Sequence, residues 1–126
     1  MHENDVSDRI IGAAIEVHRA LGPGLLEGVY EEALCHELHL RGLAFERQKG
    51  VPIAYKGVKL STDLRLDLIV ENLVIVDVKA KEEMTKKDHA KTLTYLRLTG
   101  IRLGLNINFH EPMLADGVRR IVNGLT

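Results

Sequence analysis

Apolar residues recur every three or four positions in two stretches near the N-terminus, a pattern typical of amphipathic helices. The first predicted helix spans residues 8–21 and the second spans residues 25–41, with a break at residues 22–24 (Gly-Pro-Gly) between them. Asp5 or Ser7 is suited to cap the start of the first helix, because short polar side chains accept hydrogen bonds from free backbone N–H groups.

After the second predicted helix the apolar period changes to that of β-strands. Strands are expected at residues 45–55, 64–70, 73 or 74 to 78, and 103–109, with a third helix at residues 86–98. Residues 118–125 fit either a short helix or a strand. The order α-α-β-β-β-α-β predicts an α/β (α+β) sandwich in which helices flank a mixed sheet.

Length and charge limit the classes of protein to consider. A chain of 126 residues is expected to form a single domain over residues 1–126. Its 17 basic and 18 acidic residues argue against binding nucleic acid by bulk charge, although a local basic groove remains compatible. No apolar run is long enough to span a membrane, and no signal peptide is recognisable. The single Cys35 is expected to be a buried apolar residue, and the chain is expected to be cytoplasmic.

The candidate chemistry lies in the predicted hairpin of residues 64–79. If three residues close its turn, Val70 opposes Val74, and Asp67 then opposes Asp77 on one face of the sheet. Lys79 shares the face of Asp77, because side chains alternate along a strand. A two-residue turn would instead place Asp67 on the opposite face. The convergence of these three side chains therefore depends on the register.

Two opposed carboxylates repel each other if they are left alone. A hard divalent cation such as Mg²⁺ takes oxygen ligands and can stabilise the charge that develops on a phosphate. Beside it, Lys79 could orient or deprotonate a water, or stabilise an anionic transition state. The alternative is a salt bridge at the end of the sheet, in which Lys79 pairs with Asp67 or Asp77.

An ordered set of motifs resembles the GxxExxY proteins, which are generally assigned to the PD-(D/E)XK nuclease superfamily. The motifs are GPGLLEGVYEEAL with its Gly24-x-x-Glu27-x-x-Tyr30, YKG at 55–57, DLIV at 67–70, DVKA at 77–80, YLRLTG at 95–100 and LGLNINF at 103–109. The resemblance covers residues 10–123. It implies a restriction-endonuclease-like core with a four-stranded mixed sheet.

The resemblance also assigns roles to individual residues. Asp67 resembles the aspartate of the "PD" half, although Leu66 stands in place of the proline. Asp77 and Lys79 resemble the (D/E)XK half. By this resemblance, Asp67 and Asp77 would hold the metal and Lys79 would be the catalytic lysine. Glu27 resembles the helical acidic residue that completes or supports the metal site.

Three further residues follow from the same resemblance. Tyr30 lies one helical turn after Glu27 and is expected to orient it or to contact substrate. Related sequences often carry Gln-x-x-x-Tyr in the next helix, and here Lys91 stands four residues before Tyr95. Both are expected to contact substrate. Lys91 could instead occupy the place of the metal or pair with a carboxylate, and this departure puts activity in question.

These observations predict a Mg²⁺- or Mn²⁺-dependent nuclease that hydrolyses phosphodiester bonds of DNA or RNA. A catalytically inactive nuclease-fold module that binds nucleic acid or a protein partner is the main alternative. A third alternative is a homo-oligomeric structural protein in which Asp67 and Lys79 form a salt bridge. A domain of this size often dimerises to cover a substrate, so a homodimer fits each of the three.

Overall fold

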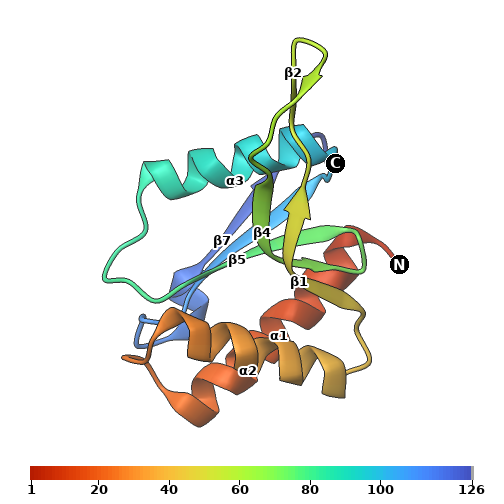
Figure 1. Cartoon of the computed structure of the whole chain (residues 1–126). Helices are drawn as coiled ribbons and strands as arrows, with labels where there is room; N and C mark the ends of the chain where they lie inside the picture. The colour runs from red at the N-terminus through yellow and green to blue at the C-terminus, as the bar shows by residue number, and fades with distance from the viewer. Residues whose placement is uncertain (126) are drawn as a thin grey trace.

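The computed structural model describes residues 1–125. The helices of this part are α1 (Glu3–Leu21), α2 (Glu27–Leu40) and α3 (Lys86–Thr99), with a short 3₁₀ helix η1 (Leu114–Gly117). The strands are β1 (Phe45–Val51), β2 (Ala54–Tyr55), β3 (Val58–Lys59), β4 (Leu64–Val70), β5 (Val74–Lys79), β6 (Leu103–Asn108) and β7 (Val118–Val122). Figure 1 shows α1 and α2 on one side of the main sheet and α3 on the other.

The main sheet has the strand order β1-β4-β5-β6-β7. Strands β5 and β6 are parallel, and the other neighbours are antiparallel. A parallel pair needs a crossover connection, which α3 supplies. The predicted mixed sheet flanked by helices is confirmed, in an α+β fold compatible with a restriction-endonuclease-like core. The sheet has five strands rather than four, because β7 pairs antiparallel with β6.

Helix α1 begins at Glu3, earlier than the predicted start at residue 8. The N-cap is His2, whose Nδ1 accepts a hydrogen bond from the Asn4 backbone N–H at 3.0 Å. Asp5 reaches back from the first turn, and its Oδ2 accepts from the backbone N–H of His2 at 3.3 Å. Neither Asp5 nor Ser7 is therefore the N-cap, and the reciprocal pair of bonds adds a turn to the helix.

The predicted strand over residues 45–55 is divided in two. Strand β1 ends at Val51, immediately before Pro52, which has no N–H group to continue a ladder. Beyond it, β2 and β3 pair with each other in a separate two-stranded sheet. Figure 1 shows this small hairpin projecting past the end of the main sheet.

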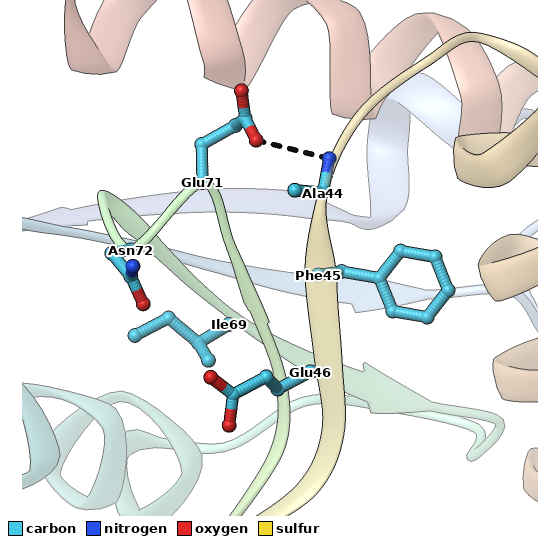
Figure 2. A pocket seen from close by; sticks show the side chains of 6 residues that line it. All are labelled: Ala44, Phe45, Glu46, Ile69, Glu71 and Asn72. Atoms are coloured by element: carbon cyan, nitrogen blue, oxygen red, sulfur yellow. Dashed lines mark hydrogen bonds between the residues drawn. The ribbon is translucent and has the colours of Figure 1, made fainter.

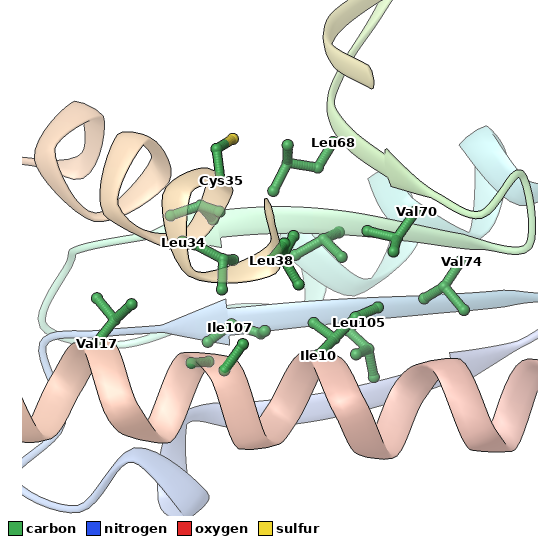
Figure 3. Packing of buried hydrophobic residues seen from close by; sticks show 14 of the residues in the cluster. Ile10, Val17, Leu34, Cys35, Leu38, Leu68, Val70, Val74, Leu105 and Ile107 are labelled. Atoms are coloured by element: carbon green, nitrogen blue, oxygen red, sulfur yellow. The ribbon is translucent and has the colours of Figure 1, made fainter. Parts of the chain in front are cut away.

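The larger hydrophobic core fills the space between the sheet and the α1–α2 layer (Figure 3). Cys35 belongs to this core as predicted, and burial raises the pKa of its thiol to about 11. A smaller core lies under α3 and includes Ile75 and Leu96. Here the helix approaches β6 closely, because a Cβ atom added at Gly104 would lie 2.7 Å from Thr92 Cγ2. Helix α3 thus sits over β6 and β7.

Candidate active site

The β4–β5 hairpin has the register on which the predicted site depends. Val70 pairs with Val74, so a three-residue turn closes the hairpin. The backbone ladder ends at the pair Leu68–Val76, and beyond it Asp67 Oδ2 accepts a hydrogen bond from the Val78 N–H at 2.9 Å. A side chain thus replaces the backbone acceptor where the two strands separate. The same register sets Asp67 opposite Asp77.

The Asp77 carboxylate is buried in an environment that opposes its charge. Asp77 is only 7% exposed. Its Oδ2 is the one buried side-chain oxygen or nitrogen atom in residues 1–125 that has no hydrogen-bond partner. Lys79 Nζ lies 3.3 Å from this oxygen, as an ion pair. Burial, followed by the interaction with the Asp67 carboxylate, raises the pKa of Asp77 to about 6. The positive charge of Lys79 therefore offsets the charge of the carboxylate pair only in part.

Lys79 lies between two carboxylates. Its Nζ is 3.3 Å from Asp77 Oδ2 and 4.0 Å from Asp88 Oδ1. Burial lowers the pKa of Lys79, but the charges of Asp77, Glu27 and Asp88 outweigh it, and the net shift of the pKa is upward. Lys79 is therefore protonated at neutral pH, where it can stabilise negative charge but cannot accept a proton.

Asp77→Asn is expected to stabilise the metal-free protein above pH 6. The pKa of Asp77 rises from its ordinary 3.8 to about 6 on folding, so between these values the folded protein holds a proton that the unfolded chain has released. Rising pH through this window therefore lowers the stability of the wild type. A shift of about two pKa units corresponds to ~3 kcal/mol, and this shift already includes the attraction of Lys79.

Urea unfolding in the presence of a chelator measures this difference. The variant and the wild type should have equal stability near pH 4, and the variant should be more stable at about pH 7.5. An equal difference at both pH values would show that Asp77 does not titrate in this window.

Asp88 is a buried member of the site that the sequence does not indicate. It lies in the first turn of α3, and its Oδ2 accepts from Lys81 Nζ at 2.8 Å and from the Thr85 N–H at 2.7 Å. Burial opposes its ionisation, but these hydrogen bonds outweigh burial and lower the pKa of Asp88. The spacing of Thr85 and Asp88 predicts a helix capping box. The sequence therefore gives no reason to expect the second contact of Asp88, which is with Lys79.

A row of polar residues crosses the sheet beneath α3. Asp77 lies beside Asn106 on β6, and Asn106 lies opposite Arg119 on β7. The buried Asn106 amide accepts from the Thr92 hydroxyl at 2.6 Å and donates to the Asp88 carbonyl at 3.3 Å. At the end of this row is a pocket of about 310 Å³, lined by Met84, Thr85, Lys86, Asp88, His89, Asn106 and Arg119. The polar position of Asn106 within an apolar strand was the signal that could have identified it.

Glu27 stands at the edge of this arrangement. It is the first residue of α2 and is exposed, and its charge contributes to the raised pKa of Lys79. The structure does not bring it into a ligand set with Asp67 and Asp77. Indeed, residues 1–125 contain no group of three His, Cys, Asp or Glu side chains arranged to hold a metal ion. Glu27 can act on the site through its charge.

The structure places Tyr30 in the core, whereas the sequence motif predicts a contact with substrate. The side chain is fully buried, and its ring stacks on Phe109 with centroids 4.7 Å apart. Its hydroxyl donates to the Gly22 carbonyl at 2.5 Å and accepts from the Leu25 N–H at 3.1 Å. Tyr30 therefore fixes the loop that leads into α2 and does not reach solvent or orient Glu27 directly.

Lys91 and Tyr95 lie together on α3. Lys91 Nζ is 5.4 Å from the centroid of the Tyr95 ring, and Tyr95 packs partly buried against the smaller core. Among the ion pairs of residues 1–125, none joins Lys91 to a carboxylate. Its positive charge nevertheless opposes the rise in the pKa of Asp77. Lys91 therefore faces the same side of the sheet as the aspartate pair.

A second pocket, of about 300 Å³, lies at the β4–β5 turn and the start of β1 (Figure 2). It contains two acidic residues, Glu46 and Glu71. Figure 2 shows Glu71 turned to the Ala44 backbone N–H, which donates to Glu71 Oε2 at 2.9 Å. Glu46 pairs with Lys49. None of the predicted site residues lines this pocket, and its carboxylates hold the turn and the strand in place.

The donor set of the aspartate pair fits a hard divalent cation. Two carboxylates supply oxygen ligands, and the unpartnered Asp77 Oδ2 has no other hydrogen bond to lose. Mg²⁺ usually keeps several waters, so two protein ligands are sufficient when water and phosphate oxygens complete the shell. Lys79 forms an ion pair with Asp77 but not with Asp67, so the charge of Asp67 is left without an ion-pair partner in the described part of the chain.

A family model described as the PD-(D/E)XK nuclease superfamily matches residues 4–121. The matched segment contains every predicted site residue and points to nuclease activity, for which such proteins generally use divalent metals. No curated protein and no solved structure matches the chain significantly. Among the described residues, no helix is both long and apolar enough to cross a lipid bilayer.

Proposed function

The chain belongs to the PD-(D/E)XK nuclease superfamily, and from this premise we propose that it is a metal-dependent nuclease of the GxxExxY type that hydrolyses phosphodiester bonds. The observation that carries the proposal is the buried Asp77 Oδ2, which lacks a hydrogen bond and lies beside a second carboxylate and a lysine. A site that serves stability alone is better served by apolar residues than by an incompletely paired buried charge.

In this proposal Asp67 and Asp77 hold Mg²⁺ or Mn²⁺. When bound, the ion supplies Lewis-acid stabilisation of the charge that develops on the phosphate. Lys79 keeps its proton and stabilises the same charge through its ammonium group, held between Asp77 and Asp88. Glu27 tunes the electrostatic environment of Lys79 from the start of α2.

The substrate approaches from the side of α3. Lys91 contributes a positive charge near Asp77, which favours a phosphate group there. Tyr95 holds the lysine side chain through its ring, at 5.4 Å from Nζ to the centroid. These two residues are substrate-positioning residues in the proposal.

A second candidate function is binding without catalysis. It is favoured by Lys91, because the permanent positive charge of this residue near the aspartate pair partly replaces the charge of a metal ion. The absence of a third acidic ligand in the described residues favours the same alternative. Such a protein would bind nucleic acid through the nuclease fold and release it unchanged.

The two candidates are separated by a cleavage assay on duplex DNA, single-stranded DNA and structured RNA. We expect turnover with Mg²⁺ or Mn²⁺ that a chelator stops and that Asp77→Asn abolishes. Glu46→Gln is the matched control, because it removes a carboxylate at the remote pocket of Figure 2. Saturable binding without turnover, across both metals and all three substrates, would refute the nuclease and support the binding module.

A further inference from the structure

The small hairpin formed by β2 and β3 is an exposed cationic arm. We define this arm as residues 53–60, with the sequence IAYKGVKL. Figure 1 shows it extending beyond the main sheet, away from the α1–α2 layer. It contains Lys56 and Lys59 and no acidic residue, in a chain whose net charge is −1. Within residues 1–125, neither lysine lies within 4.0 Å of a carboxylate.

The arm also carries apolar side chains that the rest of the protein does not cover. Tyr55 is 61% exposed and Val58 is 63% exposed, although both are in strands. The backbone of the arm is held by the β2–β3 pairing and by a hydrogen bond from the Leu60 N–H to the Ile53 carbonyl at 2.8 Å. The arm is therefore a formed two-stranded ribbon with an exposed amphiphilic surface.

The tip of the arm places a lysine where backbone geometry disfavours one. Lys56 and Gly57 are the two turn residues, with φ of 49° and 80°. A two-residue turn with positive φ at both positions strongly prefers Asn-Gly or Gly-Gly. Lysine adopts this left-handed conformation only with strain, and such outliers suggest a function for the residue. The positive charge that Lys56 presents at the tip of the arm is therefore a candidate for a role in binding.

A duplex of B-form DNA matches the arm in shape and charge. The major groove is about 12 Å wide and admits a two-stranded β-ribbon, whereas the major groove of an RNA duplex is too narrow for side chains to read. The lysines carry charge complementary to the phosphates, and the exposed Tyr55 and Val58 can contact thymine methyl groups and sugars.

The arm and the candidate active site can reach the same duplex. Strand β4, which carries Asp67, follows the arm directly in the chain. Fully extended chain from Gly57 to Asp67 would span at most roughly 33 Å, about one helical turn of DNA. We propose that the arm docks in the major groove of double-stranded DNA within one turn of the phosphodiester at the aspartate pair. This inference rests on the proposed function and names its substrate as duplex DNA.

The test is a fluorescence-anisotropy titration of a duplex DNA of about 20 base pairs, with chelator present so that no cleavage occurs. The variant is Lys56→Asn/Lys59→Thr. Asparagine suits the turn position and threonine suits the strand, so the charge is removed while the arm is kept. We expect binding about tenfold weaker and a salt slope lower by about 2, since each lysine contributes ~1.

Arg9→Gln is the control, because it removes an exposed positive charge from α1, on the other side of the sheet, that forms no ion pair among residues 1–125. The control should keep the wild-type salt slope, and a duplex RNA should lose little affinity on the arm substitutions. An unchanged affinity and slope in the arm variant, an equal loss in the control, or no duplex binding by the wild type would overturn the inference. So would a change of oligomeric state in the arm variant by light scattering, since it would identify the arm as a contact between copies.

The outcomes also separate this inference from the proposed function. Cleavage of duplex DNA by an arm variant with unchanged salt slope would refute the arm and leave the nuclease intact. Arm-dependent DNA binding without turnover in any divalent metal would support the arm and refute the nuclease.

Discussion

Lys79→Ala is expected to lower kcat for phosphodiester cleavage by roughly 10²–10³-fold, the usual loss for one preorganised donor to a developing negative charge. The ammonium group is mostly buried, lies 3.3 Å from Asp77 Oδ2 and keeps its proton because the surrounding carboxylates raise its pKa. Lys79→Arg should retain part of the activity, since the charge remains. Steady-state kinetics with saturating Mg²⁺ measure both variants.

Lys81→Ala is the matched control for this experiment. Lys81 is also a lysine close to the site, and its Nζ donates a hydrogen bond to Asp88 Oδ2 at 2.8 Å. It forms no ion pair with Asp77. We expect a loss of less than about tenfold in Lys81→Ala, because a partly exposed ion pair contributes little. An equal loss in both variants, or near-wild-type cleavage by Lys79→Ala, would assign Lys79 to the folding of the site alone.

Tyr30→Ala is expected to lower the free energy of unfolding by about 3–5 kcal/mol, the range for truncating a buried aromatic side chain. The substitution removes a fully buried ring stacked on Phe109 and two hydrogen bonds to the loop before α2. Tyr30→Phe keeps the stacking and should cost about 1–2 kcal/mol, because Gly22 O and Leu25 N lose their partner. Urea unfolding measures both variants.

The outcome for Tyr30→Phe distinguishes a structural role from a substrate contact. A loss of stability with KM unchanged at a temperature where the variant is folded supports the structural role. Unchanged stability together with a raised KM would contradict it and restore the substrate contact expected from the sequence motif.

The hairpin geometry of the site was predictable from the sequence except for the length of its turn, because it depends on local rules. Alternation along two apolar strands and the length of one turn decide which side chains oppose each other. The sequence left two turn lengths open, and the Val70–Val74 pair shows that three residues close the turn and that Asp67 and Asp77 share a face. The number of strands was less predictable, because residues 118–122 form a strand only by pairing with β6.

The contacts of the remaining site residues were not predictable, because their environment comes from distant parts of the chain. Asp88 and Asn106 meet where α3 crosses β6, and the Asp88 spacing to Thr85 has a sufficient local explanation as a cap. Tyr30 and Glu27 are three residues apart, so they differ by only about 60° around the helix. That difference is enough to bury one against Phe109 and expose the other.

The central claim is that Asp67 and Asp77 bind a divalent cation, and calorimetric titration with Mg²⁺ and Mn²⁺ tests it most directly. The titration is done above the Asp77 pKa of about 6, where protons do not compete, and is repeated with a short DNA duplex to supply phosphate oxygens. We predict binding to the wild type that Asp67→Asn/Asp77→Asn abolishes. A folded wild type that binds neither ion, with or without DNA, would contradict the account.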